Sequence, residues 1–217
     1  MSAVSLLVAD DHDVVRRGIR ALIEEQQPGW QIAAEAKDGR DAVAKATEFQ
    51  PDVAILDITM PSLNGIDAAM QIAKLSPRTK VLFLTIHESD QLSRKALDAG
   101  ARGYILKTDA AFDLITAVSS LLSNKTFFTP KIAQMVLNGY LGKGPTNSED
   151  APLQITARER EIVQLLAEGK HSKAVATVLA ISVKTVETHR SNILRKLHCH
   201  SVADLVRYAV RNHIVEA

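Results

Sequence analysis

Four short apolar runs in the first half of the chain each end at residues that can take part in chemistry. The runs are VSLLVA, VAIL, VLFL and YIL, and they are followed by Asp10 and Asp11, Asp57, Thr85, and Lys107. Runs of this length, alternating with segments of helical periodicity, are typical of buried parallel strands in a βα repeat. Because such strands end at one edge of a sheet, their ends should meet in one place. The pattern predicts a site built from three carboxylates, a hydroxyl and an ammonium.

The first half of the chain repeats this strand-and-helix unit five times. Gly, Pro and Asn-Gly pairs separate the segments, and the connections are as short as α/β units require. Since parallel strands need helices on both faces, the order predicts an α/β fold with a doubly wound, five-stranded parallel sheet. The expected strands are 4–9, 31–36, 53–57, 81–85 and 103–106, and the expected helices are 12–26, 39–49, 65–74, 89–99 and 110–123.

The second half of the chain has a different pattern. A short helical pattern follows Pro130, and residues 138–152 are then rich in Gly, Pro, Asn and Ser, as linkers are. The remainder lacks strand signals, and a tight connection near Ile181 between two short helices is typical of a helix-turn-helix. The helices expected there are 157–168, 172–180, 183–197 and 201–213.

These patterns divide the chain into three parts: a first domain over 1–123, a linker helix and flexible hinge over 124–152, and a small all-α domain over 153–217. The net charge of +1 hides a difference between them. From Leu153 onward, ten Lys and Arg face six Asp and Glu, whereas acidic residues are in excess before it. A basic helical domain favours an acidic partner such as DNA.

Composition excludes several classes of protein. The 217 residues are 46% hydrophobic and 24% charged, which is ordinary for a soluble globular protein. No apolar run approaches the roughly 18 residues that span a bilayer, and no basic segment precedes the first apolar run as in a signal peptide. The single cysteine, Cys199, rules out an internal disulfide. We therefore expect a cytoplasmic protein that does not bind membranes.

The predicted site at the strand ends suits phosphoryl chemistry. A carboxylate accepts a phosphoryl group only if negative charge is neutralised, and neighbouring carboxylates increase the repulsion unless a divalent cation lies among them. Mg²⁺ prefers oxygen ligands and remains able to bind a phosphoryl oxygen. Lys107 would neutralise a second phosphoryl oxygen and the Thr85 hydroxyl would donate to a third. These groups predict a Mg²⁺-assisted aspartyl-phosphate site.

Segments around these residues resemble the receiver domain of two-component response regulators. The resemblance covers residues 4–123 and is carried by VADDH, LDITMPSLNG, LTIHES and GYILK. It implies a flavodoxin-like sheet of strand order 2-1-3-4-5 and phosphorylation by a sensor histidine kinase. Onto this sequence it carries Asp57 as phosphoacceptor; Asp10, Asp11, Asp57 and the backbone carbonyl of Thr59 as Mg²⁺ ligands; Thr85 and Tyr104 as switch residues; and Lys107 as the phosphate-pairing lysine.

The last domain resembles the LuxR-type (NarL/FixJ) output domain through ITARERE, LLAEGK, ISVKTVETHRSNILRKL and SVADLVRYAV. The resemblance implies a four-helix unit whose third helix, 183–197, enters the DNA major groove. On that helix Val186, Ile193 and Leu197 recur at helical spacing and should face the core, which leaves a polar face for DNA. We expect phosphate contacts from Lys184, Thr185, Arg190, Arg195 and Lys196, and base contacts from Glu187, Thr188 and Ser191.

Two places depart from the patterns usual in these families. Ile86, directly after the fourth expected strand, is bulky and β-branched where many receivers have a smaller residue. The second helix of the last domain lacks the usual pair of Ser and Glu capping residues, because His171 and Ala174 stand at those places. We therefore expect Ser172 to cap that helix alone.

These features predict a phosphorylation-dependent transcription factor of a two-component system. It would accept a phosphoryl group on Asp57 and bind double-stranded DNA at an inverted repeat as a homodimer, with RNA polymerase as a further candidate partner. It would be no enzyme beyond catalysing its own phosphoryl transfer and dephosphorylation. Two alternatives stay open: a phosphorylation-independent DNA binder whose receiver only dimerises, and a Mg²⁺-dependent phosphatase, which would leave the helix-turn-helix unexplained.

Overall fold

The computed structural model describes residues 3–141 and 155–216, which form two separate compact units, one in each range. Each unit has a hydrophobic core of its own. Most of the flexible hinge expected between the domains lies at 142–154, outside the described residues. No helix in the described ranges is both long enough and apolar enough to cross a membrane.

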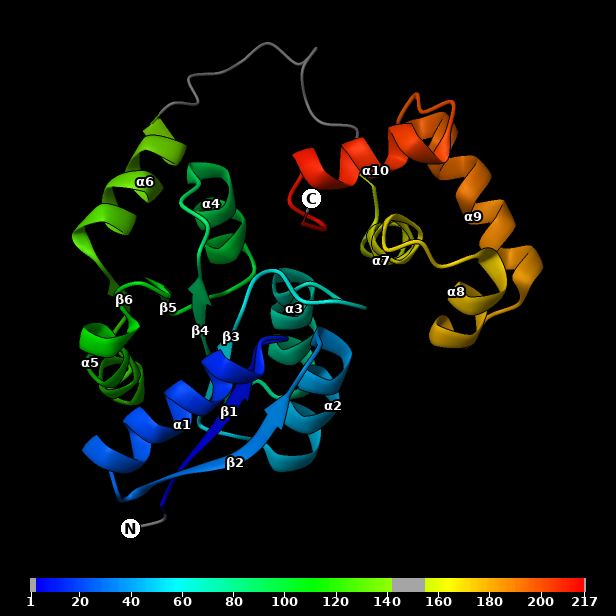
Figure 1. Ribbon diagram of the computed structural model, residues 1–217. Coiled ribbons are helices and arrows are strands. Elements are labelled where there is room, and N and C mark those ends of the chain that lie inside the picture. The colour runs from blue at the N-terminus through cyan, green and yellow to red at the C-terminus, as the bar shows by residue number, and fades with distance from the viewer. Residues whose placement is uncertain (1–2, 142–154, 217) are drawn as a thin grey trace. The chain divides into compact units, whose positions relative to one another are not determined.

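The first unit is an α/β domain (Figure 1). Its strands are β1 (Val4–Ala9), β2 (Trp30–Ala36), β3 (Val53–Leu56), β4 (Lys80–Thr85), β5 (Gly103–Leu106) and β6 (Phe127–Phe128). Its helices are α1 (Asp13–Gln26), α2 (Gly39–Phe49), α3 (Gly65–Leu75), α4 (Asp90–Asp98), α5 (Ala110–Leu122) and α6 (Pro130–Leu141). The strands form one parallel sheet in the order β2-β1-β3-β4-β5-β6.

Alternate residues along the strands pack on opposite faces of the sheet. Leu6 and Val8 of β1 lie in a core with α1 and α5, whereas Leu7 and Ala9 lie in a core with α2, α3 and α4. Because both faces are covered, the strands are continuous apolar runs and do not alternate with polar residues. The predicted doubly wound fold and the strand order 2-1-3-4-5 are confirmed.

The sheet also has a sixth strand, so the predicted count of five is wrong. β6 pairs in parallel with β5, with Phe127 opposite Gly103. Two residues are too few to show the alternation that marks a strand in a sequence. After β6, the expected helix α6 packs against α4. Its Ile132 is 0% exposed within the core on that face, and Lys131 Nζ lies 2.5 Å from Glu88 Oε1. The first helix of the expected linker is thus packed onto the first unit.

The second unit consists of four helices, as predicted. They are α7 (Ala157–Ala167), α8 (Ser172–Leu179), α9 (Val183–Lys196) and α10 (Val202–Arg211). Each contributes to one core, which includes Ile162, Val175, Val186, Ile193 and Leu205.

The helix ends of this unit follow the sequence closely, with one exception. Thr156 and Glu159 form a reciprocal capping box at the start of α7. At α8 the prediction that Ser172 caps alone is wrong: the cap is His171, whose Nδ1 accepts from the Ala174 N–H at 3.4 Å. An unprotonated imidazole nitrogen is an acceptor and can replace the usual hydroxyl. The turn between α8 and α9 is tight because Ala180 adopts a left-handed conformation (φ 51°).

Candidate phosphoacceptor site and nucleic-acid interface

The strand register places the predicted site residues at one edge of the sheet. The last residues of β1 and β3 are paired, and so are the last residues of β4 and β5. Asp10 and Asp57 directly follow the first pair, Thr85 ends β4, and Lys107 directly follows β5. The backbone therefore brings these four residues to neighbouring positions at the carboxyl edge.

Lys107 joins two carboxyl groups at the centre of the site. Its Nζ lies 2.7 Å from Asp57 Oδ2 and 2.7 Å from Asp10 Oδ2, and both aspartates are almost fully buried. Burial raises the pKa of Asp57 to about 6, although the hydrogen bond from Lys107 opposes this shift. Burial also works to lower the pKa of Lys107, but the closeness of the Asp10 and Asp57 carboxyl groups outweighs it and raises that pKa. The site thus has one ammonium for two buried carboxyl groups.

Acidic oxygens cluster beside this lysine in a way that fits a divalent cation. Asp10, Asp11, His12 and Asp57 each offer a ligand atom, and these atoms lie within 4.8 Å of one another. Asp10 Oδ2 is buried and accepts no directed hydrogen bond from the described residues, although the Lys107 ammonium is close. Hard cations such as Mg²⁺ and Ca²⁺ are bound by oxygens of this kind. His12 was not predicted to lie here; its position next to Asp11 is the only sequence signal.

His87 connects three of the predicted residues on the other side of Asp57. Its N–H donates to the Thr85 hydroxyl at 3.2 Å, and its carbonyl oxygen accepts from Tyr104 Oη at 3.0 Å. Its Nε2 lies 3.5 Å from Thr59 Oγ1, and the Thr59 N–H donates to Asp57 Oδ1 at 3.4 Å. Burial raises the pKa of Tyr104 to about 12, so its hydroxyl remains a donor. The structure brings Thr59, Thr85 and Tyr104 into one chain of contacts that reaches Asp57.

A glycine lets α3 begin directly behind Asp57. The Gly65 N–H donates to the Ile58 carbonyl oxygen at 2.7 Å. A Cβ at Gly65 would lie 1.9 Å from the Asp57 carbonyl oxygen, far inside van der Waals contact. Because only glycine permits this approach, Gly65 helps to fix the backbone that carries the carboxylate.

In the second unit, α9 separates an apolar face from a polar one. Val186 and Ile193 are fully buried and Leu197 packs against the same core, which confirms the predicted core face. Arg190 is half-buried. The predicted DNA-contacting side chains that are exposed are Lys184, Thr185, Glu187, Thr188, Ser191, Arg195 and Lys196.

Lys196 has a partner inside the domain, which its predicted role did not include. Its Nζ donates to both carboxylate oxygens of Glu159, at 2.7 and 2.9 Å, and so ties α9 to α7. The bond to Lys196 lowers the pKa of Glu159. This ion pair occupies the Lys196 ammonium in the free domain, and the phosphate contact expected of Lys196 stays a prediction. In the described part of the chain, Glu187 and Arg190 do not form the ion pair that their spacing allows.

Known protein families match both units. Residues 6–119 match the response regulator receiver domain, and residues 153–209 match the bacterial regulatory proteins of the luxR family. The chain belongs to the two-component response regulators with a LuxR-type helix-turn-helix output domain. It is a phosphorylation-dependent DNA-binding regulator of transcription, and its two domains imply a histidine kinase and DNA as partners.

Individual relatives match between 64% and 99% of this chain. Oxygen regulatory protein NreC of Staphylococcus epidermidis is 36% identical over 98% of this chain and 100% of its own length. A LuxR-family response regulator from Aurantimonas sp. SI85-9A1 has a TM-score of 0.60 at 33% identity, and the match covers 64% of this chain and 99% of that one. Response regulator ChrA of a heme-sensing two-component system has a TM-score of 0.53 at 30% identity over 99% of this chain and 100% of its own.

Proposed function

We propose that Asp57 is the sole phosphoacceptor of this regulator. The observation that carries the proposal is the environment of its carboxylate, which is buried with Lys107 at 2.7 Å on one oxygen and the Thr59 N–H at 3.4 Å on the other. When Asp57 is phosphorylated, negative charge moves to the phosphoryl oxygens. The Lys107 ammonium and the Thr59 N–H are placed to stabilise that charge. Asp10 and Asp11 lie beside it as metal ligands.

The cation that we propose for this site is Mg²⁺. Asp10, Asp11 and Asp57 would hold it through carboxylate oxygens, together with the backbone carbonyl of Thr59. When bound, it supplies positive charge that offsets the repulsion between the aspartates and an incoming phosphate. The buried Asp10 Oδ2 and the close spacing of the acidic ligand atoms support this assignment.

In the proposed reaction, a carboxylate oxygen of Asp57 attacks the phosphorus atom of the donor. A P–O bond forms to Asp57, and the P–N bond of the kinase phosphohistidine breaks with its electron pair remaining on the imidazole. Lys107, already in contact with Asp57, then pairs with a phosphoryl oxygen. The Thr85 hydroxyl accepts from the His87 N–H, so its own proton is free to be donated to another phosphoryl oxygen. Water later attacks the phosphorus atom, the P–O bond to Asp57 breaks, and inorganic phosphate leaves as the carboxylate is restored.

The output of the regulator is DNA binding through α9. Thr185, Arg190 and Arg195 join Lys184 as phosphate contacts, and Thr188 and Ser191 join Glu187 as contacts to base edges. Phosphorylated chains would pair as a symmetric homodimer on an inverted repeat, where RNA polymerase is a further candidate partner. A cytoplasmic location, in which kinase and DNA are both accessible, is part of this proposal.

Labelling with acetyl phosphate and Mg²⁺ tests the phosphoacceptor. Asp57→Ala should abolish the mass increase of one phosphoryl group, because Asp10, the other carboxylate that lies 2.7 Å from Lys107, is proposed to bind the cation and not to accept phosphate. Asp13→Ala is the matched control and should still be labelled at saturating Mg²⁺, since Asp13 faces Arg16 and not Asp57. Continued labelling of the Asp57 variant would refute the assignment.

Salt-dependent binding tests the division of DNA contacts. Lys184→Ala should weaken binding equally on all sequences and lower the slope of log affinity against log salt by about one. Ser191→Ala should change which base is preferred. Lys196→Gln serves as the control: because Glu159 already holds the Lys196 ammonium, it should lower stability and change the salt slope less than Lys184→Ala does. A salt slope that falls in the Lys196 variant but not in the Lys184 variant would reverse these assignments.

A further inference from the structure

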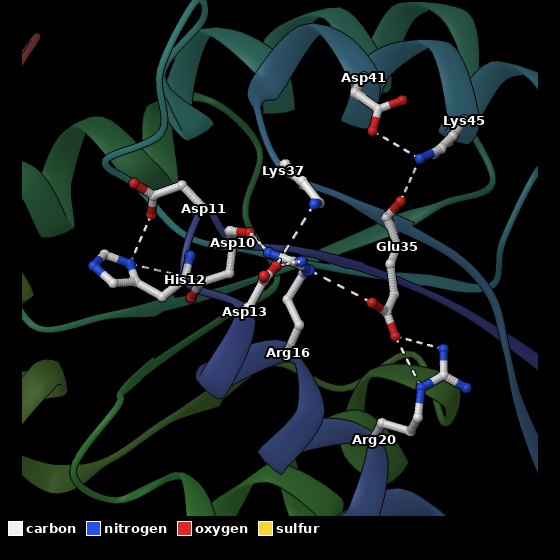
Figure 2. Close-up of polar contacts among 10 residues, drawn as sticks. All are labelled: Asp10, Asp11, His12, Asp13, Arg16, Arg20, Glu35, Lys37, Asp41 and Lys45. Atoms are coloured by element: carbon white, nitrogen blue, oxygen red, sulfur yellow. Dashed lines mark hydrogen bonds and ion pairs between the residues drawn. The ribbon is translucent and has the colours of Figure 1, made fainter.

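Arg16 lies in the second turn of α1 with only 5% of its surface exposed. Its Nη1 donates to the backbone carbonyl oxygen of Asp10 at 2.7 Å. Figure 2 shows the side chain reaching from α1 to the loop that carries Asp10 and Asp11. Because a guanidinium loses much hydration on burial, such a group is stable inside a protein only when its donors are well paired.

Two carboxylates orient the rest of the guanidinium (Figure 2). Nη2 forms an ion pair with Asp13, and Nε donates to Glu35 Oε2 at 3.4 Å. Glu35 belongs to β2 and also accepts from Arg20 Nε at 2.9 Å. The network therefore joins α1 to β2 and leaves Nη1 directed at the Asp10 carbonyl.

Hydrogen bonds hold Asp10 at three places: its amide N–H, its carbonyl oxygen and one carboxylate oxygen. Its N–H donates to the Ala36 carbonyl oxygen at 3.2 Å, and its Oδ1 accepts from the His12 N–H at 2.9 Å. With Arg16 on the carbonyl, the remaining Oδ2 faces Lys107 and the acidic cluster. Loss of Arg16 would leave a buried carbonyl without its donor and would release the loop that aims this oxygen.

We infer that Arg16 is a positioning residue for the metal site, which holds the Asp10 carbonyl and thereby presents the Asp10 and Asp11 carboxylates without touching the cation. The inference rests on the metal site proposed above. Removing an outer group that orients a metal ligand typically weakens metal binding 10- to 100-fold. The same network turns the Asp13 carboxylate toward Arg16 and Lys37, so that Asp13 is not a ligand.

Calorimetric titration of Mg²⁺ into the full-length protein tests this role, with thermal unfolding in EDTA as the measure of folding. Arg16→Met should bind Mg²⁺ about tenfold more weakly. Its labelling by acetyl phosphate should need correspondingly more Mg²⁺ but reach the wild-type rate at saturation. Arg16→Lys keeps the charge without the planar fork and should fall between the two. Arg20→Met is the matched control, because Arg20 contacts Glu35 but not Asp10, and should bind Mg²⁺ normally.

If Arg16→Met does not fold in EDTA, Glu35→Gln replaces it in the test. That variant keeps Arg16 and weakens one of its anchors by removing the charge of Glu35, so Mg²⁺ binding should weaken in the same direction, though less. Unchanged Mg²⁺ affinity in the folded variant, with or without a lower unfolding temperature, would overturn the inference. Asp11→Asn tests the metal site separately from Arg16. If this variant binds Mg²⁺ as the wild type does, the proposed metal site is wrong and the inferred role of Arg16 is wrong as well.

Discussion

The Tyr104 hydroxyl donates a hydrogen bond to the carbonyl oxygen of His87 at 3.0 Å, which holds the aromatic ring of β5 against the loop that follows β4. The N–H of the same histidine donates to the Thr85 hydroxyl. A movement of Thr85 toward a phosphoryl group on Asp57 would therefore disturb the Tyr104 contact. Since α4 begins just after His87, this contact links the site to a surface helix.

Tyr104→Phe tests this link, because it keeps the ring and removes the hydroxyl. Mass spectrometry should show normal phosphorylation, since Tyr104 does not touch Asp57. The gain in DNA affinity on phosphorylation should become several-fold smaller, because the shift at Thr85 is no longer passed on through His87. A wild-type gain in gel-shift titrations would remove Tyr104 from the switch.

Substitutions of Ile132 and Leu137 on α6 test whether that helix belongs to the receiver. Ile132 is 0% exposed in the core beneath α4, whereas Leu137 is 52% exposed. Ile132→Ala should lower the free energy of unfolding of the first unit by about 2–5 kcal/mol. Leu137→Ala should change it by less than about 0.5 kcal/mol. Similar effects of both substitutions in urea unfolding would mean that α6 is not docked.

The stability of the first unit should depend on pH through Asp57. Burial raises the pKa of Asp57 from 3.8 to about 6, so ionising it is less favourable in the folded protein than in the unfolded chain. The stabilisation of the folded state that this raised pKa provides is complete below about pH 4, and it is lost as the pH rises through about 6. In EDTA at pH 8, Asp57→Asn should therefore be more stable than the wild type, by at most about 3 kcal/mol.

This difference should close as the pH falls from 8 to 4 in thermal unfolding experiments. Added Mg²⁺ should stabilise the wild type and leave Asp57→Asn almost unchanged, because a ligand stabilises only the form that binds it. A difference that stays constant across that range of pH would contradict the assignment of the raised pKa to Asp57.

Alanine substitutions at Gly65 and Gly18 test whether the backbone behind Asp57 requires a glycine. A Cβ at Gly65 would collide with the Asp57 carbonyl oxygen, whereas a Cβ at Gly18 in α1 meets nothing within 4 Å. Gly65→Ala should lower the free energy of unfolding by about 1–3 kcal/mol and slow labelling of Asp57. Gly18→Ala should raise it by about 0.5–1 kcal/mol. Equal thermal shifts would show that α3 can move away from Asp57.

The strands and the polar residues at their ends were predictable because each lies within one short segment. Apolar runs mark β1, β3, β4 and β5, and parallel pairing then brings Asp10, Asp57 and Lys107 together, as the distances show. β6 was missed because two residues carry no periodicity. The packing of α6 onto α4 could not be predicted either, since the apolar face of a helix does not indicate which element it packs against.

Contacts between side chains far apart in the sequence were the other feature that could not be predicted. Lys196 was placed among the DNA contacts from its position on α9, but Glu159 on α7 binds it. The burial of Arg16 depends on Glu35 in a neighbouring strand, which no local pattern indicates. Charged residues on a helix are usually solvated, and only the folded structure shows which of them are not.

Phosphoryl transfer to Asp57 should control DNA affinity, and gel-shift titration of three samples tests this control most directly. The samples are the fragment from Leu153 onward, the unmodified full-length protein, and the full-length protein with Mg²⁺ and beryllofluoride, on DNA selected by the fragment. We expect the fragment to bind without activation, the unmodified protein to bind more weakly, and beryllofluoride to restore affinity in the wild type but not in Asp57→Ala. Equal affinity in all three samples would contradict the claim and leave the receiver as a constitutive dimerisation module.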